Sequence, residues 1–151
     1  MTQPAAAPRR SLTLAHWFVI GLALFSFALS AILSNSVFER LPHLEDEMAY
    51  LFQARTLAGG HLVIDSPAPA RAYWQPFVVD YNGTRFGKYS LGWPAQLALG
   101  VLLGEAWIVN AAFAALSVAL VFRLGSEIFG KEAGVVAAAL VAFSPAAILL
   151  S

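Results

Sequence analysis

Three consecutive acids, Glu45, Asp46 and Glu47, follow closely on a long uncharged stretch of the chain. A carboxylate at the mouth of a membrane helix can act as a general base or coordinate a divalent cation. It can also do no more than start a helix, with Asp46 as the capping residue and its neighbours favouring the positive end of the helix dipole. The acids alone do not decide between these roles.

A second polar cluster, formed by Arg85, Lys88 and Tyr89, follows further along the chain. A carboxylate and an ammonium group at one lipid–water boundary are suited to an anionic lipid head group and to a nucleophile that needs a base. The two clusters together therefore predict a site for an anionic lipid and a reacting nucleophile, provided that the elements between them bring them close together.

The composition indicates a membrane protein. Hydrophobic residues make up 59% of the chain and charged residues only 12%, with a mean hydropathy of +0.69. This is too apolar for a soluble domain of 151 residues. The net charge of zero gives no sign of the basic patch that nucleic acids require. The lack of cysteine excludes thiol catalysis, disulfides and cysteine metal sites.

The uncharged run 12–34 is long enough, at about 1.5 Å per residue, to cross a hydrocarbon core of about 30 Å. Arg9 and Arg10 precede it, so the positive-inside rule places the amino terminus in the cytoplasm. A cleaved signal peptide is the alternative, but its apolar region is shorter, about 7 to 15 residues. Two later apolar runs, 106–124 and 133–151, are expected to span as the second and third helices.

The segment between the first two spanning runs is rich in charge and is expected to be extracytoplasmic. Its stretch 46–58 predicts a juxtamembrane helix that ends at Gly59-Gly60 and rests on the membrane. The run 91–103 covers only about 20 Å, so it is expected to be a second interfacial helix, with a spanning helix as the open alternative. Asn82-Gly83 between two β-prone runs predicts a hairpin. The apolar face of the first of these helices is expected to contain Leu44, Met48, Leu51, Phe52 and Ala58.

The predicted fold is therefore an all-α membrane protein with three transmembrane helices, juxtamembrane amphipathic helices and a short β-hairpin. Within the second spanning run, Asn110 is expected to be a hydrogen-bonded packing residue, and Ala111 and Ala115 predict close helix packing. The expected parts are a cytoplasmic tail 1–11, spanning helix 12–34, extracytoplasmic loop 35–105, spanning helix 106–124, cytoplasmic turn 125–132 and spanning helix 133–151.

The acidic pair Asp46-Glu47 followed by Tyr50 and "ARTLAGGHL", and later "DYNGTRFGKYSLGWPAQLALG", resembles a known family. It is similar to the amino-terminal part of the polytopic, GT-C type glycosyltransferases that depend on polyprenyl phosphates, related to protein O-mannosyltransferases and lipid A aminoarabinose transferases. The resemblance covers most of residues 12–151. Ser90-Leu91 departs from the family pattern, since many relatives have prolines after the lysine-tyrosine pair.

The resemblance implies a multi-pass cell-membrane enzyme that moves a hexosyl or pentosyl group from a polyprenyl phosphate to a protein, lipid or glycan acceptor at the outer face. Asp46 would be the catalytic base, or would hold Mg²⁺ or Mn²⁺ together with Glu47. The substrate-binding residues implied are Glu47, Tyr50, Lys88 and Tyr89, with Lys88 at the donor phosphate.

Members of that family have more spanning helices, so the chain is expected to be a truncated amino-terminal module that is inactive by itself. The alternative hypothesis is a small membrane protein without enzymatic activity, whose outer loop binds a partner protein or cations. The sequence names neither the sugar nor the acceptor.

Overall fold

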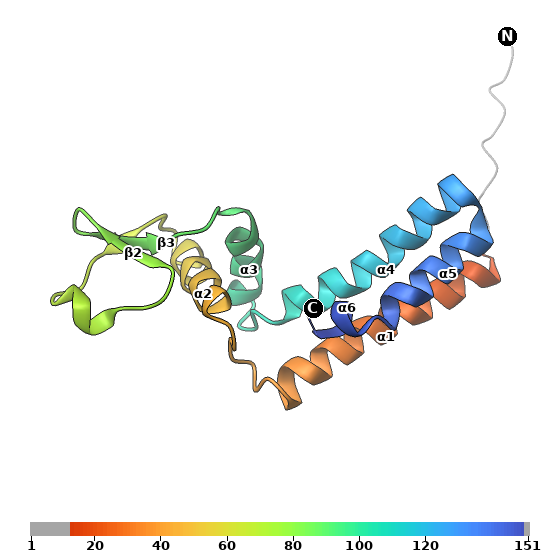
Figure 1. Cartoon of the computed structure of the whole chain (residues 1–151), viewed down its shortest axis with the longest axis horizontal. Helices are drawn as coiled ribbons and strands as arrows, with labels where there is room; N and C mark the ends of the chain where they lie inside the picture. The colour runs from red at the N-terminus through yellow and green to blue at the C-terminus, as the bar shows by residue number, and fades with distance from the viewer. Residues whose placement is uncertain (1–12, 150–151) are drawn as a thin grey trace, which may run out of the picture.

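The computed structural model describes residues 13–149, which form six α-helices and a small antiparallel sheet. Figure 1 shows two parts. Helices α1, α4, α5 and α6 lie side by side and are called the bundle here, and α2, α3 and the sheet form the lobe at one end of it. The predicted tail 1–11 lies outside the described residues.

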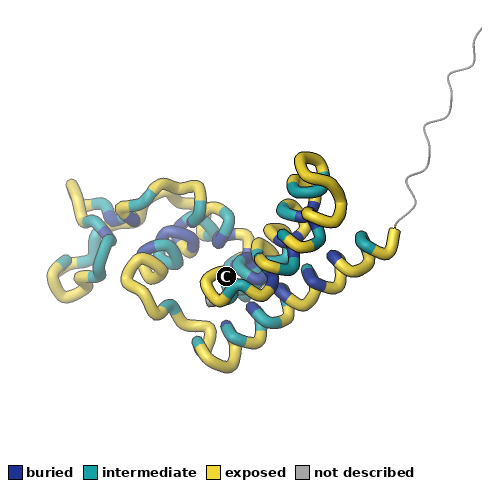
Figure 2. The backbone as a smooth tube through the Cα atoms, turned by 45° about the vertical axis from the view of Figure 1, so that its right-hand side comes forward, coloured by how far each residue is buried: buried dark blue, intermediate teal, exposed yellow. Residues whose placement is uncertain are grey.

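Two helices of the bundle are long enough and apolar enough to cross a membrane: α1 (Leu14–Ser36) and α4 (Ile108–Phe129). Only 22% of the apolar window of α1 and 17% of that of α4 is buried, so most of their surface is free to face lipid. Figure 2 shows the same pattern, with exposed residues along the outer sides of these helices. Both agree with the spans predicted at 12–34 and 106–124.

The third predicted span differs from the structure. The run 133–151 is divided between α5 (Lys131–Ala142) and α6 (Pro145–Leu149), and residues 150–151 are not described. The break falls at Pro145, because proline lacks the backbone N–H and disfavours helical geometry in the residue before it. At about 1.5 Å per residue, α5 extends about 18 Å, which is short of a hydrocarbon core.

The predicted cytoplasmic turn 125–132 is much shorter in the structure. Helix α4 continues to Phe129, and Gly130, with φ of +92°, is the single residue between α4 and α5. Arg123 and Glu127 form an ion pair of 3.1 Å one helical turn apart, which suits a helix that extends beyond the lipid. The charges thus mark the end of the apolar run rather than the end of the helix.

The two helices that meet at Gly130 pack unusually closely. Gly125 of α4 faces Gly134 of α5, and a Cβ atom on Gly134 would lie 2.6 Å from the carbonyl oxygen of Phe122. The close contact is therefore made by glycines, which the alanine pattern at Ala111 and Ala115 did not predict. The core of the bundle consists of Val19, Leu22, Val118, Phe122, Ala138 and Ala142.

The sheet of the lobe contains β1 (Ile64–Asp65), β2 (Val78–Tyr81) and β3 (Thr84–Gly87) in the order β1-β3-β2, all antiparallel. The predicted hairpin is confirmed, because Tyr81 pairs with Thr84 across Asn82 and Gly83, which both have positive φ as a type I′ turn requires. The third strand, β1, was not predicted. A short 3-10 helix, η1 (Ala70–Tyr73), lies between β1 and β2.

Helix α2 (Glu45–Ala58) begins one residue before its predicted start and ends at the predicted glycines. The N–H of His61 donates to Thr56 O and that of Gly60 to Leu57 O, the pattern of a Schellman motif, with Gly60 at φ of +81°. Helix α3 (Gly92–Leu102) confirms the short helix predicted at 91–103.

Helix α2 packs between β3 and α3, so its buried face differs from the predicted apolar stripe. Leu44 and Met48 are exposed, whereas Ala49, Gln53 and Ala54 are buried. Gln53 is buried because it joins two backbone segments: its side-chain amide donates to Leu62 O at 2.8 Å and accepts from the Gly87 N–H at 2.7 Å. A polar side chain thus fixes the sheet on the helix.

The two chain segments that connect the lobe to the bundle lie at the same end of the bundle (Figure 1). Arg40 in the first segment forms an ion pair of 2.6 Å with Glu105 in the second, and its guanidinium lies 5.8 Å from the centre of the Trp107 ring. The opposite end of the bundle contains Thr13 and Lys131, whose side chains are 3.2 Å apart.

Candidate functional site

The fold brings four of the predicted site residues together. Asp46 and Tyr50 lie on successive turns of α2, and Lys88 and Tyr89 follow directly after β3. Because β3 packs on α2, the Tyr89 hydroxyl reaches Asp46 and donates a hydrogen bond of 2.5 Å to its carboxylate. Residues that are 43 positions apart in the chain therefore meet at one point.

Aromatic rings surround this contact. The centre of the Tyr89 ring lies 4.8 Å from that of the Tyr50 ring and 5.6 Å from that of the Phe77 ring. The Lys88 ammonium sits 4.5 Å from the Phe77 ring centre and 5.4 Å from that of Tyr89, within the range of cation–π attraction. We call Asp46, Tyr50, Phe77, Lys88 and Tyr89 the Asp46–Lys88 cluster.

The charge of Lys88 is not neutralised by an acid. Within residues 13–149 the ion pairs with N–O distances of 4.0 Å or less do not include Lys88, and the residue is exposed. Its backbone N–H donates to Phe77 O at 2.9 Å, which holds the residue in place while its ammonium faces solvent. The ammonium is therefore available to an anionic ligand.

The pKa of Tyr89 is raised from 10.0 to about 12. The main cause is the hydrogen bond that its hydroxyl donates to Asp46, and partial burial and the neighbouring negative groups add to it. Tyr89 therefore stays protonated over the physiological pH range and continues to donate to the carboxylate. One oxygen of Asp46 is fixed by this bond.

Glu47 has different hydrogen-bond partners from Asp46. Its carboxylate accepts hydrogen bonds from the backbone N–H groups of His43 at 2.8 Å and Leu44 at 3.2 Å. The residue at the cap position of α2 is Leu44, so the prediction of Asp46 as the cap is wrong. Glu47 supplies the stabilising side chain from within the first turn. Asp46 is thereby left to interact with Tyr89.

Arg85, which the sequence grouped with Lys88 and Tyr89, is turned away from them. It lies on the face of β3 that packs on α2, is 5% exposed, and donates to Tyr73 O. Its guanidinium is 3.9 Å from Asp80 and lies over the Phe52 ring. Alternation along the strand explains the difference: Arg85 and Gly87 are both buried.

The described residues contain no group of three or more histidine, aspartate or glutamate side chains that could hold a metal. Asp46 and Glu47 are the residues that the resemblance suggested as ligands of Mg²⁺ or Mn²⁺. Their carboxylates accept hydrogen bonds from different groups, Asp46 from Tyr89 and Glu47 from the backbone of His43. We therefore assign no metal ligands.

A cavity of about 350 Å³ opens beside the Asp46–Lys88 cluster, between the end of α1, the segment 38–44, α2, α3 and the start of α4. We call it the mouth cavity. Tyr50 lines this cavity and its ring also packs on Tyr89, so Tyr50 belongs to both the mouth cavity and the cluster. Its lining combines the apolar Leu41, Leu44, Leu51 and Leu97 with the aromatic Trp93 and Trp107 and the polar Arg40, His43 and Glu47.

The sequence did not identify Phe77 or Arg40 as site residues. Phe77 has a positive φ of 58°, and no residue pattern indicates that its ring faces Lys88. Arg40 follows the first spanning run, where a basic residue is a common interfacial feature, and only its pairing with Glu105 places it over the mouth cavity.

No family model, curated protein or solved structure matches the chain.

Proposed function

We propose that the chain is the amino-terminal module of an integral-membrane glycosyltransferase that moves a sugar from a polyprenyl phosphate to an acceptor at the extracytoplasmic face. The observation that carries the proposal is the Asp46–Lys88 cluster. It combines an oriented carboxylate with an ammonium that forms no ion pair within residues 13–149, at the end of a bundle with two helices of spanning length.

In this proposal Lys88 binds the phosphate of the donor. As the bond between the anomeric carbon and the phosphate oxygen breaks, the electron pair remains on that oxygen, and the ammonium stabilises its growing charge. The cation–π contacts with Phe77 and Tyr89 hold the ammonium at the surface without neutralising it. The phosphate oxygen thus binds an ammonium that no acid among residues 13–149 neutralises.

Asp46 acts as the base. The acceptor oxygen or nitrogen attacks the anomeric carbon from the side opposite the phosphate, its proton passes to the carboxylate, and the configuration is inverted. Tyr89 positions the carboxylate by donating to one oxygen, which leaves the other oxygen for the acceptor. The apolar and aromatic lining of the mouth cavity suits the first isoprenoid units of the donor.

Binding of the lipid phosphate tests the role of Lys88. We expect Lys88→Ala to weaken binding of undecaprenyl phosphate in nanodiscs by roughly tenfold, which corresponds to about 1.4 kcal/mol. Lys131→Ala is the matched control, because this exposed lysine lies at the opposite end of the bundle. Equal binding by the two variants would remove Lys88 from the proposed site.

Transfer tests the role of Asp46. In membranes that contain the full product of the gene, supplied with a panel of polyprenyl-phosphate sugars, Asp46→Asn should lower transfer by about a hundredfold or more. Glu45→Gln is the control, since Glu45 is the adjacent exposed acid. Near-normal transfer by Asp46→Asn would exclude Asp46 as the base.

The second candidate function is a membrane protein without enzymatic activity, whose lobe binds a partner protein or cations. The observation that favours it is that both acids have structural partners, Glu47 at the start of α2 and Asp46 on Tyr89. In that case Asp46→Asn would lower the stability of the lobe, and Lys88→Ala would leave lipid phosphate binding unchanged.

A further inference from the structure

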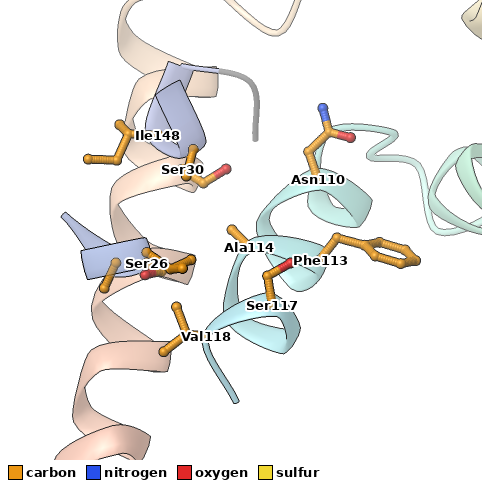
Figure 3. A pocket seen from close by; sticks show the side chains of 11 residues that line it. Ser26, Ser30, Asn110, Phe113, Ala114, Ser117, Val118 and Ile148 are labelled. Carbon is orange, nitrogen blue, oxygen red and sulfur yellow. The ribbon is translucent and has the colours of Figure 1, made fainter. Parts of the chain in front are cut away.

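A second cavity, of about 250 Å³, lies between the helices of the bundle, and none of its lining residues belongs to the Asp46–Lys88 cluster. Figure 3 shows it between α1 and α4, with the short helix α6 beside it. Its polar lining comes from Ser26 and Ser30 of α1 and from Asn110 and Ser117 of α4. We call it the bundle cavity.

Several of these polar groups have no partner. Ser30 is 2% exposed and Ser26 is 8% exposed, and their hydroxyl oxygens and Oδ1 of Asn110 make no hydrogen bond within residues 13–149. The sequence had predicted a hydrogen-bonded Asn110, so this oxygen differs from expectation. A buried polar group without a partner costs about 1 to 3 kcal/mol. In a bundle surrounded by lipid, bulk water cannot remove that cost, whereas a hydrogen-bonding occupant of the cavity can.

The lining also defines the charge of the occupant. Among the residues that the structure describes, no aspartate, glutamate, lysine, arginine or histidine lines the bundle cavity. An ion would lose its hydration there without gaining a counter-charge, so the cavity suits neutral molecules. Since one water takes up about 30 Å³ in the liquid, the volume is sufficient for several waters.

The bundle cavity is continuous in its polar lining with the mouth cavity. Asn110 lines both cavities. Ser26, Ser30 and Ser34 follow one another at intervals of four along one face of α1, and Ser34 lines the mouth cavity. Hydrogen-bonding side chains therefore extend from the lining of the mouth cavity to that of the bundle cavity.

We propose that the bundle cavity is a hydrated site that takes water and other small neutral hydrogen-bonding molecules from the mouth cavity and excludes ions. The serines of α1 and the amide of Asn110 supply its hydrogen bonds. The proposal does not depend on glycosyl transfer, because none of the residues of the Asp46–Lys88 cluster lines the cavity.

The absence of native cysteine allows a direct test with single cysteines in lipid nanodiscs. Ser30→Cys places a thiol in the cavity, whereas Leu24→Cys and Ile32→Cys place it on the exposed outer surface of the same helix, at residues that are 64% and 58% exposed. Only the thiolate attacks methyl methanethiosulfonate, forming a mixed disulfide and releasing methanesulfinate, and a thiolate requires water. We expect Ser30→Cys to react about a hundredfold faster than either control.

Filling the cavity provides the second measurement. Ala114 lines the cavity, whereas Ala112 is exposed on the same helix. Ala114→Phe should abolish the fast reaction of Ser30→Cys, and Ala112→Phe should leave it unchanged. The proposal is overturned if Ser30→Cys reacts as slowly as the lipid-facing controls, if those controls react as fast as Ser30→Cys, or if Ala114→Phe has no effect.

Discussion

Tyr89 is the residue on which the Asp46–Lys88 cluster depends, since it contacts Asp46 through its hydroxyl and Tyr50, Phe77 and Lys88 through its ring. A tyrosine hydroxyl that donates to a carboxylate is held neutral, because ionisation would break the bond and bring two negative charges together. This contact can be measured apart from any catalytic activity.

We predict that Asp46→Asn lowers the pKa of Tyr89 from about 12 towards 10.0. The amide still accepts a hydrogen bond but carries no charge to repel the phenolate. The measurement is the ultraviolet titration of the phenolate in the wild type and in Asp46→Asn, with Tyr89→Phe to assign the transition. An unchanged titration in Asp46→Asn would contradict the contact.

The raised pKa of Tyr89 also determines how the free energy of unfolding changes with pH. Because the folded-state pKa of Tyr89 lies above its ordinary value of 10.0, the contribution of this bond is fully present below about pH 10. It is lost as the pH rises towards 12. Asp46→Asn should make stability less dependent on pH over that window.

At the residue scale, the two polar clusters of the sequence predicted that Asp46 lies near Lys88 and Tyr89, and the family resemblance added Tyr50. The sequence did not predict the partners of Gln53 or Arg85. Both are polar residues, and both are buried because they bind the backbone of another element. Such partners depend on tertiary packing, which residue type and spacing do not reveal.

At the scale of elements, hydropathy predicted α1 and α4 well, because both helices have the length and the apolar composition that a spanning helix requires. It predicted the ends of helices less well. Arg123 and Glu127 ended the apolar run but not the helix, and the α5 helix ended at a proline although the apolar run continued. Local backbone chemistry, rather than hydropathy, decides these boundaries.

The contact between α4 and α5 leads to a prediction at this scale. Gly134→Ala should destabilise the protein by about 1 to 3 kcal/mol, because the new methyl group meets the Phe122 carbonyl oxygen, which belongs to a rigid helix backbone. Chemical unfolding in detergent measures the change.

Gly21→Ala is the matched control for Gly134→Ala. A Cβ atom at Gly21 of α1 would have nothing within 4 Å, and alanine favours the helix over glycine. We expect this variant to be as stable as the wild type or slightly more stable. Equal stability of Gly134→Ala and the wild type would show that α5 can move away from α4.

At the scale of the whole molecule, the order of elements places the lobe at one end of the bundle and the Gly130 junction at the other (Figure 1). The sequence anticipated this arrangement from two spanning runs with a charged segment between them. It did not anticipate that the lobe is a packed unit, because β1 has only two residues and its pairing with β3 has no local signal.

The orientation in the membrane is the prediction at this scale. With Arg9 and Arg10 in the cytoplasm, Asn82→Cys in the hairpin turn should react with an impermeant maleimide only from the extracytoplasmic side. Lys131→Cys should react only from the cytoplasmic side. Sealed vesicles of both orientations provide the measurement, and labelling of the two positions from the same side would refute the topology.

The ion pair between Arg40 and Glu105 ties together the two chain segments that lead into and out of the lobe. The first half of the chain contains α1 and α2, and the second half contains α3 and α4. Because α1 packs on α4 and α2 packs on α3, the two halves contact each other both in the bundle and in the lobe. Continuity of the backbone at the exposed turn between Asn82 and Gly83 is then not needed for assembly. Two separate polypeptides, 1–82 and 83–151, should associate in the membrane into a protein of the same shape.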